Sequence, residues 1–171
     1  SITYGGGVGK AVGLHNGTGL QWASSGTTGY NTNFTEIQGT TTSGDMDGSD
    51  NWDYICSVDP TGTLNAATNY PAFNFANTYG QTAGLTGTDY EDGWYFPAIV
   101  ELKSVYDNRH IVAESLSAVG GAETLGGINY WSSSQYSSND DYACRMSFGY
   151  GSVIDYKNYK YSVLVVQAFN C

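Results

Sequence analysis

The sequence predicts a single α+β domain, and three observations support that prediction. Apolar side chains recur at helical spacing in the middle of the chain, apolar and polar residues alternate towards its C-terminus, and two short apolar runs flank a turn near its N-terminus. A chain of 171 residues fits one domain, residues 1–171, that buries roughly 70% of its unfolded surface. The expected core is therefore stable without disulfide bonds.

The two apolar runs near the N-terminus predict a β-hairpin. Residues 11–14 and 20–23 flank the segment 15–19, and a short link built on Asn-Gly is typical of a hairpin turn. Residues 24–63 are rich in Gly, Thr, Ser and Asp and show no sustained period, so we expect a long irregular excursion there. The expected anchors of this excursion are its apolar residues, Trp52, Tyr54 and Ile55.

Three helices are expected in the middle of the chain. The first two begin after Pro71 and Pro97, because a proline at a helix start loses no hydrogen bond. Gly80 is the expected end of the first helix, and the third runs from about His110 to residues 120–121. Each helix carries an apolar stripe that is expected to pack on a sheet: Ala72, Phe73, Ala76 and Tyr79; Ile99, Leu102, Val105 and Tyr106; Val112, Leu116 and Val119.

Towards the C-terminus the period changes to two, which predicts β-strands. In residues 144–148 the apolar side chains share one face, expected to point inward, while Arg145 and Ser147 share the other face, expected to point to solvent. A turn is expected at residues 149–151. Residues 163–169 form an almost unbroken apolar run, which is typical of a strand covered on both faces.

The stretch from Tyr130 to Ser162 holds seven of the 15 tyrosines, with serine, asparagine and aspartate in most of the gaps. Tyrosine offers a large rigid contact surface and short polar residues offer adaptable hydrogen bonds, so this composition is typical of a recognition surface. Tyr130 and Tyr161 fit either the core or the surface. Clustered exposed aromatic residues mark interaction sites, and the tyrosines expected to be exposed are Tyr150, Tyr156 and Tyr159.

The net charge of −10 argues against nucleic acid as a partner, because nucleic-acid binding rests on neutralising phosphates with lysine and arginine. The same reasoning disfavours sulfated polysaccharides and anionic membranes. Residues 1–129 carry all of the excess acid, so we expect an acidic body with a near-neutral C-terminal surface. The charged residues of that surface are Asp140, Asp141, Asp155, Arg145, Lys157 and Lys160.

No apolar run reaches the length of a membrane span, and no secretory leader opens the chain. The start at Ser1 is expected to reflect trimming of a longer protein, so that contact with a membrane would be made only through an anchor outside this fragment. Abundant Gly, Thr, Asn and Tyr with little lysine is more typical of an exported surface protein than of a cytosolic enzyme.

Few residues are candidates for a metal site or for catalysis. The candidate metal ligands are Asp45, Asp47 and Asp50, followed by Asp53; alternating carboxylates suit calcium, but the segment is no EF-hand loop, and a solvated acidic loop is the simpler interpretation. The two histidines, His15 and His110, accompany no nucleophile motif, so we expect no enzyme. The three cysteines, Cys56, Cys144 and Cys171, have no metal or redox spacing, and their pairing stays open.

Two motifs resemble a known family. The segment 93–102 contains Trp-x-x-Pro-x-x-x-Glu-Leu, and the segment 130–136 contains Tyr-Trp-Ser-Ser-Ser. Both are similar to the formylglycine-generating-enzyme branch of the C-type lectin fold, and the chain most closely resembles the variable proteins of diversity-generating retroelements. It departs from their pattern at Gln167, where relatives often have arginine, at Cys144 and at residues 95–96.

The resemblance implies a C-type lectin-like fold and a variable region at about residues 130–169, in which a reverse transcriptase rewrites selected codons. The scaffold would be Trp131, Ser132, Ser133, Ser134, Ala143, Phe148 and Phe169. The diversified, ligand-binding positions would be Asn139, Asp140, Tyr142, Arg145, Ser147, Tyr150, Ser152, Asp155, Tyr156, Asn158, Tyr159 and Tyr161.

The resemblance further implies an exported lipoprotein of the bacterial outer membrane that binds a protein or glycan on another cell or on a host. The alternatives are an adhesin of fixed specificity or a carbohydrate-binding C-type lectin-like domain, and an enzyme of the formylglycine-generating or sulfoxide-synthase type. Two histidines cannot supply a three-histidine iron site, and no paired reactive cysteines stand near the C-terminal end. An enzyme is therefore not expected.

Overall fold

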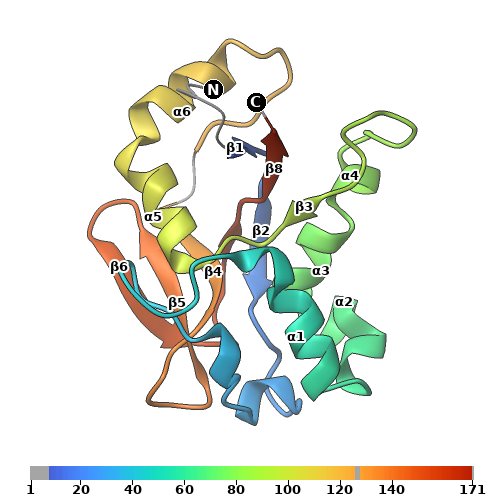
Figure 1. Cartoon of the computed structure of the whole chain (residues 1–171), viewed down its shortest axis with the longest axis vertical. Coiled ribbons are helices and arrows are strands. Elements are labelled where there is room, and N and C mark those ends of the chain that lie inside the picture. The colour runs from blue at the N-terminus through green and yellow to red at the C-terminus, as the bar shows by residue number, and fades with distance from the viewer. Residues whose placement is uncertain (1–7, 126–127, 171) are drawn as a thin grey trace.

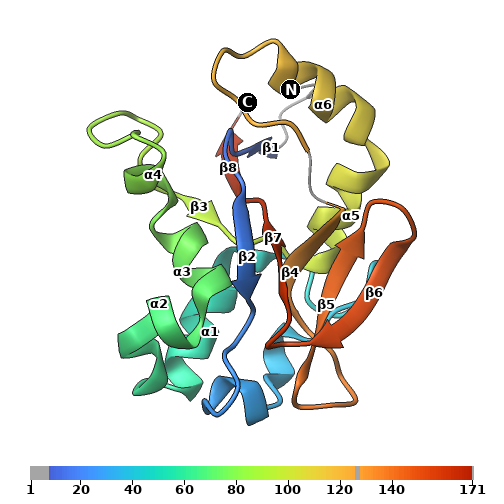
Figure 2. The same cartoon turned by 180° about the vertical axis from the view of Figure 1, so that it is seen from behind.

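The computed structural model, which describes residues 8–125 and 128–170, has an α+β fold with two sheets and several helices (Figures 1 and 2). The strands are β1 (Val8–Val12), β2 (Gly17–Gln21), β3 (Trp94–Tyr95), β4 (Asn129–Gln135), β5 (Tyr142–Ser147), β6 (Gly151–Tyr156), β7 (Lys160–Val163) and β8 (Val166–Asn170). The α-helices are α1 (Asn51–Val58), α2 (Ala66–Asn69), α3 (Pro71–Asn77), α4 (Tyr79–Thr82), α5 (Ile99–Asp107) and α6 (Arg109–Ser117). Short 3₁₀ turns are η1 (Gly29–Asn31), η2 (Thr35–Ile37), η3 (Gly48–Asp50) and η4 (Gly62–Asn65).

The first and last strands of the chain pair with each other. The smaller sheet has the order β1-β8-β3 and the larger one the order β2-β7-β4-β5-β6. All neighbouring strands are antiparallel except β4 and β7, which meet in parallel at Tyr130 and Ser162. Figure 1 shows β1 and β8 in the upper half of the molecule and the loop between β4 and β5 near its lower end.

The predicted N-terminal hairpin was wrong. Both strands exist, but β1 pairs with β8 and β2 pairs with β7, in different sheets. The backbone groups of the link bind distant parts of the chain instead of closing a turn: the Gly13 amide donates to the Val165 carbonyl, the His15 amide to the Tyr79 hydroxyl and the Asn16 amide to the Glu123 carboxylate. Long-range partners thus outweigh the local preference of Asn-Gly.

The predicted helices after Pro71 and Pro97 are confirmed as α3 and α5, and they pack on the sheets. Two predicted boundaries were wrong: Gly80 lies inside α4, and α6 ends at Ser117. Gly80 is needed for close packing, since a Cβ there would collide with the Glu91 carbonyl oxygen. The prediction of an irregular excursion over residues 24–63 was wrong in part, because this segment contains α1, whose Ile55 is fully buried in the core.

Strand β4 and the segment 163–166 separate two apolar cores. Trp131, Val163 and Val165 join the first core, and Tyr130, Leu164 and Val166 join the second, which α5 closes. Consecutive residues therefore point to opposite sides, and all of these side chains are buried. The prediction of two-sided burial is confirmed for residues 163–166 and wrong beyond them, because Ala168 on β8 is exposed.

Candidate ligand-binding surface

Four tyrosines meet where β5 begins and β6 ends. Tyr142 and Tyr156 face each other across the two strands, with ring centroids 4.4 Å apart and planes inclined by 29°. Tyr159 lies 5.5 Å from Tyr156, and Tyr136 lies 6.4 Å from Tyr142. We call these four residues the tyrosine cluster. Tyr156 is 37% exposed and Tyr159 47% exposed, so both rings are accessible to a partner.

The tyrosine cluster lies in a negative electrostatic environment. A hydrogen bond with Tyr156, followed by desolvation and the charges of Asp141 and Asp155, raises the pKa of Tyr142 to about 12. Burial raises the pKa of the neighbouring Tyr30, and Asp141 adds to that shift. The hydroxyl of Tyr142 therefore stays protonated at neutral pH and can serve as a hydrogen-bond donor.

A polar network covers part of the sheet beside the tyrosine cluster. Arg145 Nε donates to Asp155 Oδ2 at 3.2 Å, and its Nη1 donates to Asn129 Oδ1 at 2.6 Å. The Tyr161 hydroxyl donates to the same oxygen of Asp155 at 2.5 Å, while the guanidinium lies 4.7 Å from the Tyr161 ring centre. Burial and the bond to Asp155 raise the pKa of Tyr161 to about 12. These side chains satisfy one another and are held in place.

The loop that follows β4 is shaped from within by Gln135. This side chain is fully buried, and its Nε2 lies 3.0 Å from the Tyr136 carbonyl, 2.9 Å from that of Asn139 and 3.0 Å from that of Tyr142. The loop backbone is thus fixed while the side chains of Asn139 and Asp140 stay exposed. Nothing in the sequence around Gln135 indicates this function.

The prediction that Lys157 is one of the charged residues of the exposed surface was wrong, because Lys157 is fully buried. Its Nζ donates to the carbonyls of Gly29 and Thr32 at 2.9 and 2.8 Å and lies 4.6 Å from the Trp22 ring centre. Burial lowers the pKa of Lys157 to about 7, although Asp140 and Asp141 act in the opposite direction. The turn-like sequence around Lys157 gave no sign of burial.

The other predicted positions are dispersed. Ser147 was expected to face solvent and is only 1% exposed, because it ends β5 and its Oγ accepts a hydrogen bond from the Gly149 amide that closes the turn. Tyr150 is 92% exposed but lies at the opposite end of the β5–β6 hairpin from the tyrosine cluster. Ser152 is exposed on β6, and Asn158 is half-buried. The predicted surface is therefore not one continuous site.

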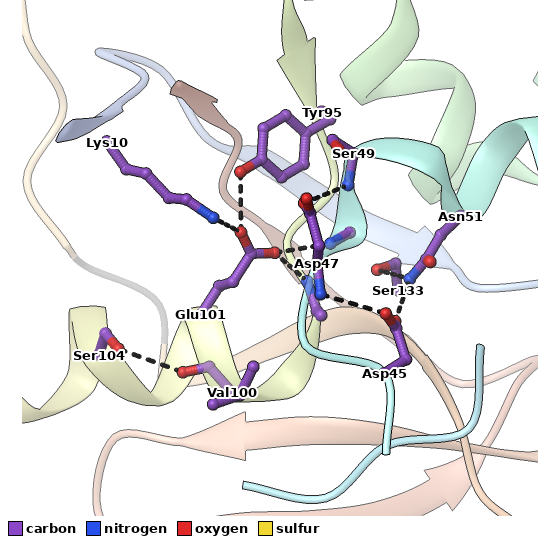
Figure 3. A network of polar contacts seen from close by, with 12 residues as sticks. Lys10, Asp45, Asp47, Ser49, Asn51, Tyr95, Val100, Glu101, Ser104 and Ser133 are labelled. Carbon is purple, nitrogen blue, oxygen red and sulfur yellow. Dashed lines mark hydrogen bonds and ion pairs between the residues drawn. The ribbon is translucent and has the colours of Figure 1, made fainter. Parts of the chain in front are cut away.

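Glu101, the acidic residue of the Trp-x-x-Pro-x-x-x-Glu-Leu motif, joins three parts of the chain (Figure 3). One carboxylate oxygen accepts from the Tyr95 hydroxyl at 2.8 Å and pairs with Lys10. The other accepts from the backbone amides of Gly48 and Ala98, both at 2.8 Å. This buried carboxylate is therefore structural.

The proposed calcium ligands instead shape the turn that precedes α1. Asp45 accepts from the Asp47 amide and from the Asn51 side chain, and Asp47 accepts from the Ser49 amide (Figure 3). Within residues 8–125 and 128–170, no group of three His, Cys, Asp or Glu side chains has the arrangement to hold a metal ion. Through its bond to the Ser49 amide, Asp47 caps the 3₁₀ turn η3.

An apolar groove of about 820 Å³ lies elsewhere, between α6 and the strands β1 and β8. Val12, Val112 and Leu116 are among its lining residues, and no residue of the tyrosine cluster takes part. Of the two histidines, His15 lies 3.6 Å from Glu123 and His110 is exposed on α6.

Comparisons of the chain with protein-family models, with curated proteins and with solved structures gave no match. In the described part of the chain, no helix combines the length and hydrophobicity that crossing a bilayer requires.

Proposed function

We propose that this chain is a C-type lectin-like recognition domain, displayed on a bacterial surface, whose C-terminal residues are diversified by a retroelement. The observation that carries the proposal is a division within residues 130–161. Fully buried framework residues alternate there with exposed tyrosine, asparagine and aspartate. Such a division lets contact residues change while the fold is kept.

The framework residues of the Tyr-Trp-Ser-Ser-Ser motif bind the backbone or side chains of other segments. The Ser132 hydroxyl donates to the Cys144 carbonyl, Ser133 accepts from the Asn51 side chain, and Ser134 accepts from the Ile99 amide at the start of α5. Trp131 Nε1 donates to the carbonyls of Leu20 and Tyr159. Exchange of any of these side chains would leave a buried polar group unpaired, which costs about 1–3 kcal/mol.

The exposed positions carry no such penalty. Substitutions of exposed side chains away from special features change stability by about 0.5 kcal/mol or less. Asn139, Asp140, Tyr150, Ser152 and Tyr159 are positions of this kind. By contrast, Arg145, Asp155 and Tyr161 share hydrogen bonds, so we expect these three to vary together.

The placement of the first and last strands supports display. β1 and β8 lie together at one end of the molecule, while the loops beside the tyrosine cluster lie at the other (Figures 1 and 2). An anchor joined to the chain near β1 would leave the tyrosine cluster pointing away from the membrane. Pairing of the first and last strands also fits a C-type lectin-like fold.

Sequencing the same locus in sibling isolates tests the proposal. We expect substitutions at the exposed positions, an unchanged Trp131-Ser132-Ser133-Ser134 segment, and a neighbouring reverse-transcriptase gene with a near-duplicate template repeat. An invariant locus without a reverse transcriptase would favour an adhesin of fixed specificity, which could use the same tyrosines to stack on sugar rings. Changes scattered evenly over framework and surface would contradict diversification.

A further inference from the structure

We infer that the tyrosine cluster, together with Asp140 and Asp141, binds a cationic side chain, a lysine or an arginine carried by a basic peptide segment of the partner. This inference rests on the proposed recognition function and specifies the class of ligand. It is carried by the ring geometry and by the distribution of charge around the rings.

The rings are arranged to receive a cation. Tyr142 and Tyr156 stack against each other, and Tyr159 is tilted by 53° against Tyr156, so the group presents ring surface in more than one direction. An ammonium or guanidinium group within about 6 Å of a tyrosine ring centre is attracted by the negative face of the ring. The chain already uses this kind of contact within the fold: Lys157 lies over Trp22, and Arg145 lies over Tyr161.

The cations of the chain are almost all unavailable to neutralise this surface. Lys10 is paired with Glu101, Lys103 with Asp107 and Arg145 with Asp155, Arg109 lies over Tyr106, and Lys157 is buried. Of the six lysines and arginines, only Lys160 is exposed without an ion pair among the described residues. Lys157 lies within electrostatic reach of Asp140 and Asp141, but burial lowers its pKa to about 7, so above pH 7 it balances only a minor part of their charge.

The acidic residues act on the tyrosine cluster directly. The charge of Asp141 contributes to the raised pKa of both Tyr30 and Tyr142, which places that carboxylate within electrostatic reach of the rings. A negative electrostatic potential that disfavours the deprotonated form of a tyrosine favours a cation at the same position. The net charge of −10 adds a long-range attraction for a basic partner.

The test measures binding of synthetic peptides to the intact chain by calorimetry. One peptide alternates lysine and glycine, and a matched peptide carries glutamine at every lysine position. We expect the basic peptide alone to bind and its Kd to rise about tenfold between about 20 mM and about 200 mM NaCl, because screening weakens the attraction. Equal binding of both peptides, or of neither, would overturn the inference.

Variants locate the site. Tyr156→Leu and Asp141→Asn are each expected to weaken binding about tenfold, whereas Tyr156→Phe, which keeps the ring, retains it. Lys160→Gln removes the exposed cation and is expected to strengthen binding about twofold to threefold. Tyr90→Ala is the matched control, because it removes an exposed tyrosine that lies outside the tyrosine-rich stretch, and it is expected to have no effect. An unchanged Kd for Tyr156→Leu would contradict the assignment.

A panel of neutral glycans separates this inference from the proposed function. If a glycan binds, the basic peptide does not bind, and Tyr156→Leu abolishes the glycan binding, then the tyrosine cluster is a recognition site but its ligand is not cationic. Failure of both ligand classes, together with an invariant locus, would remove the proposed function as well.

Discussion

Trp131 and Tyr150 lie 19 positions apart in the same tyrosine-rich stretch, yet they are expected to respond oppositely to truncation. Trp131 is fully buried and its ring lies 5.0 Å from that of Tyr161, whereas Tyr150 is 92% exposed. We predict that Trp131→Ala lowers the free energy of unfolding by about 3–5 kcal/mol. Tyr150→Ala should change it by about 0.5 kcal/mol or less. Urea denaturation measures both, and a comparable loss for Tyr150→Ala would show that this ring supports the fold.

Glu101 provides a second test at the residue scale. Its carboxylate accepts from Tyr95, Gly48 and Ala98 and pairs with Lys10. In Glu101→Gln an amide NH₂ replaces one accepting oxygen and removes the charge, so we predict a loss of about 2 kcal/mol of unfolding free energy.

The matched control for Glu101→Gln is Glu114→Gln on the exposed side of α6. This control should be neutral within about 0.5 kcal/mol. Equal urea midpoints for the two variants would contradict the structural function of Glu101.

At the scale of elements, Lys157 ties three segments together. Its carbonyl accepts from the amides of Trp22 and Ala23, its amide donates to the Asp141 carbonyl, and its Nζ binds Gly29 and Thr32. The segments so joined carry Tyr30, Tyr142 and Tyr156. The position of the tyrosine cluster thus depends on one buried cation as well as on the strand ladder.

The lowered pKa of Lys157 predicts a dependence of stability on pH. The pKa is about 7 in the folded chain and 10.5 ordinarily, so between these values the unfolded chain binds one more proton than the folded chain. Stability should rise with pH there by about 1.4 kcal/mol per pH unit, relative to Lys157→Met, which lacks the titrating group. Taking the difference in unfolding free energy between wild type and variant removes the contributions of the other titrating groups, which are the same in both proteins. Urea midpoints of both proteins at pH 7, 8 and 9 measure it, and parallel curves would show that the amine keeps its ordinary pKa.

The buried serines show how elements are joined in the same region. Ser133 and Ser134 connect β4 to Asn51 of α1 and to the first amide of α5. A helix start otherwise leaves amides without partners, so these small side chains are required where they are.

At the scale of the whole molecule, the two cores should melt together. Val163 and Val165 belong to one core and Leu164 and Val166 to the other, so neither core can open without displacing the residues of its neighbour. Trp22 and Trp131 report on the first core by fluorescence, and the Cys144 thiol reports on the second by pulsed thiol labelling. Burial raises the pKa of that thiol to about 12, so it stays unreactive while the fold is closed.

In a chain with Cys56→Ser and Cys171→Ser, we predict that the two probes give the same urea midpoint. A labelling transition at lower urea than the fluorescence transition would show that the core under α5 opens independently. The Leu164→Ala variant should shift both midpoints together by a similar amount.

The sequence by itself determined the α+β class, the starts of α3 and α5, and the two-sided burial of residues 163–166. These depend on proline at a helix start and on the spacing of apolar residues, which are local. The exposure of Tyr150, Tyr156 and Tyr159 was predicted correctly as well, because rings set among glycine and short polar residues are hard to bury.

Only the tertiary structure decided which strands pair, which charges are exposed and where the tyrosines gather. The Asn-Gly link favoured a hairpin, but β1 and β2 take partners about 160 and 140 residues away, since a local sequence pattern carries no information on long-range hydrogen bonds. Lys157 is buried although its neighbours in sequence are polar, because the carbonyls of Gly29 and Thr32, distant in the chain, bind its ammonium group. The sequence therefore identifies the residue types of a candidate surface. The pairing of β5 with β6, which places Tyr142 opposite Tyr156, decides which of these residues form a cluster.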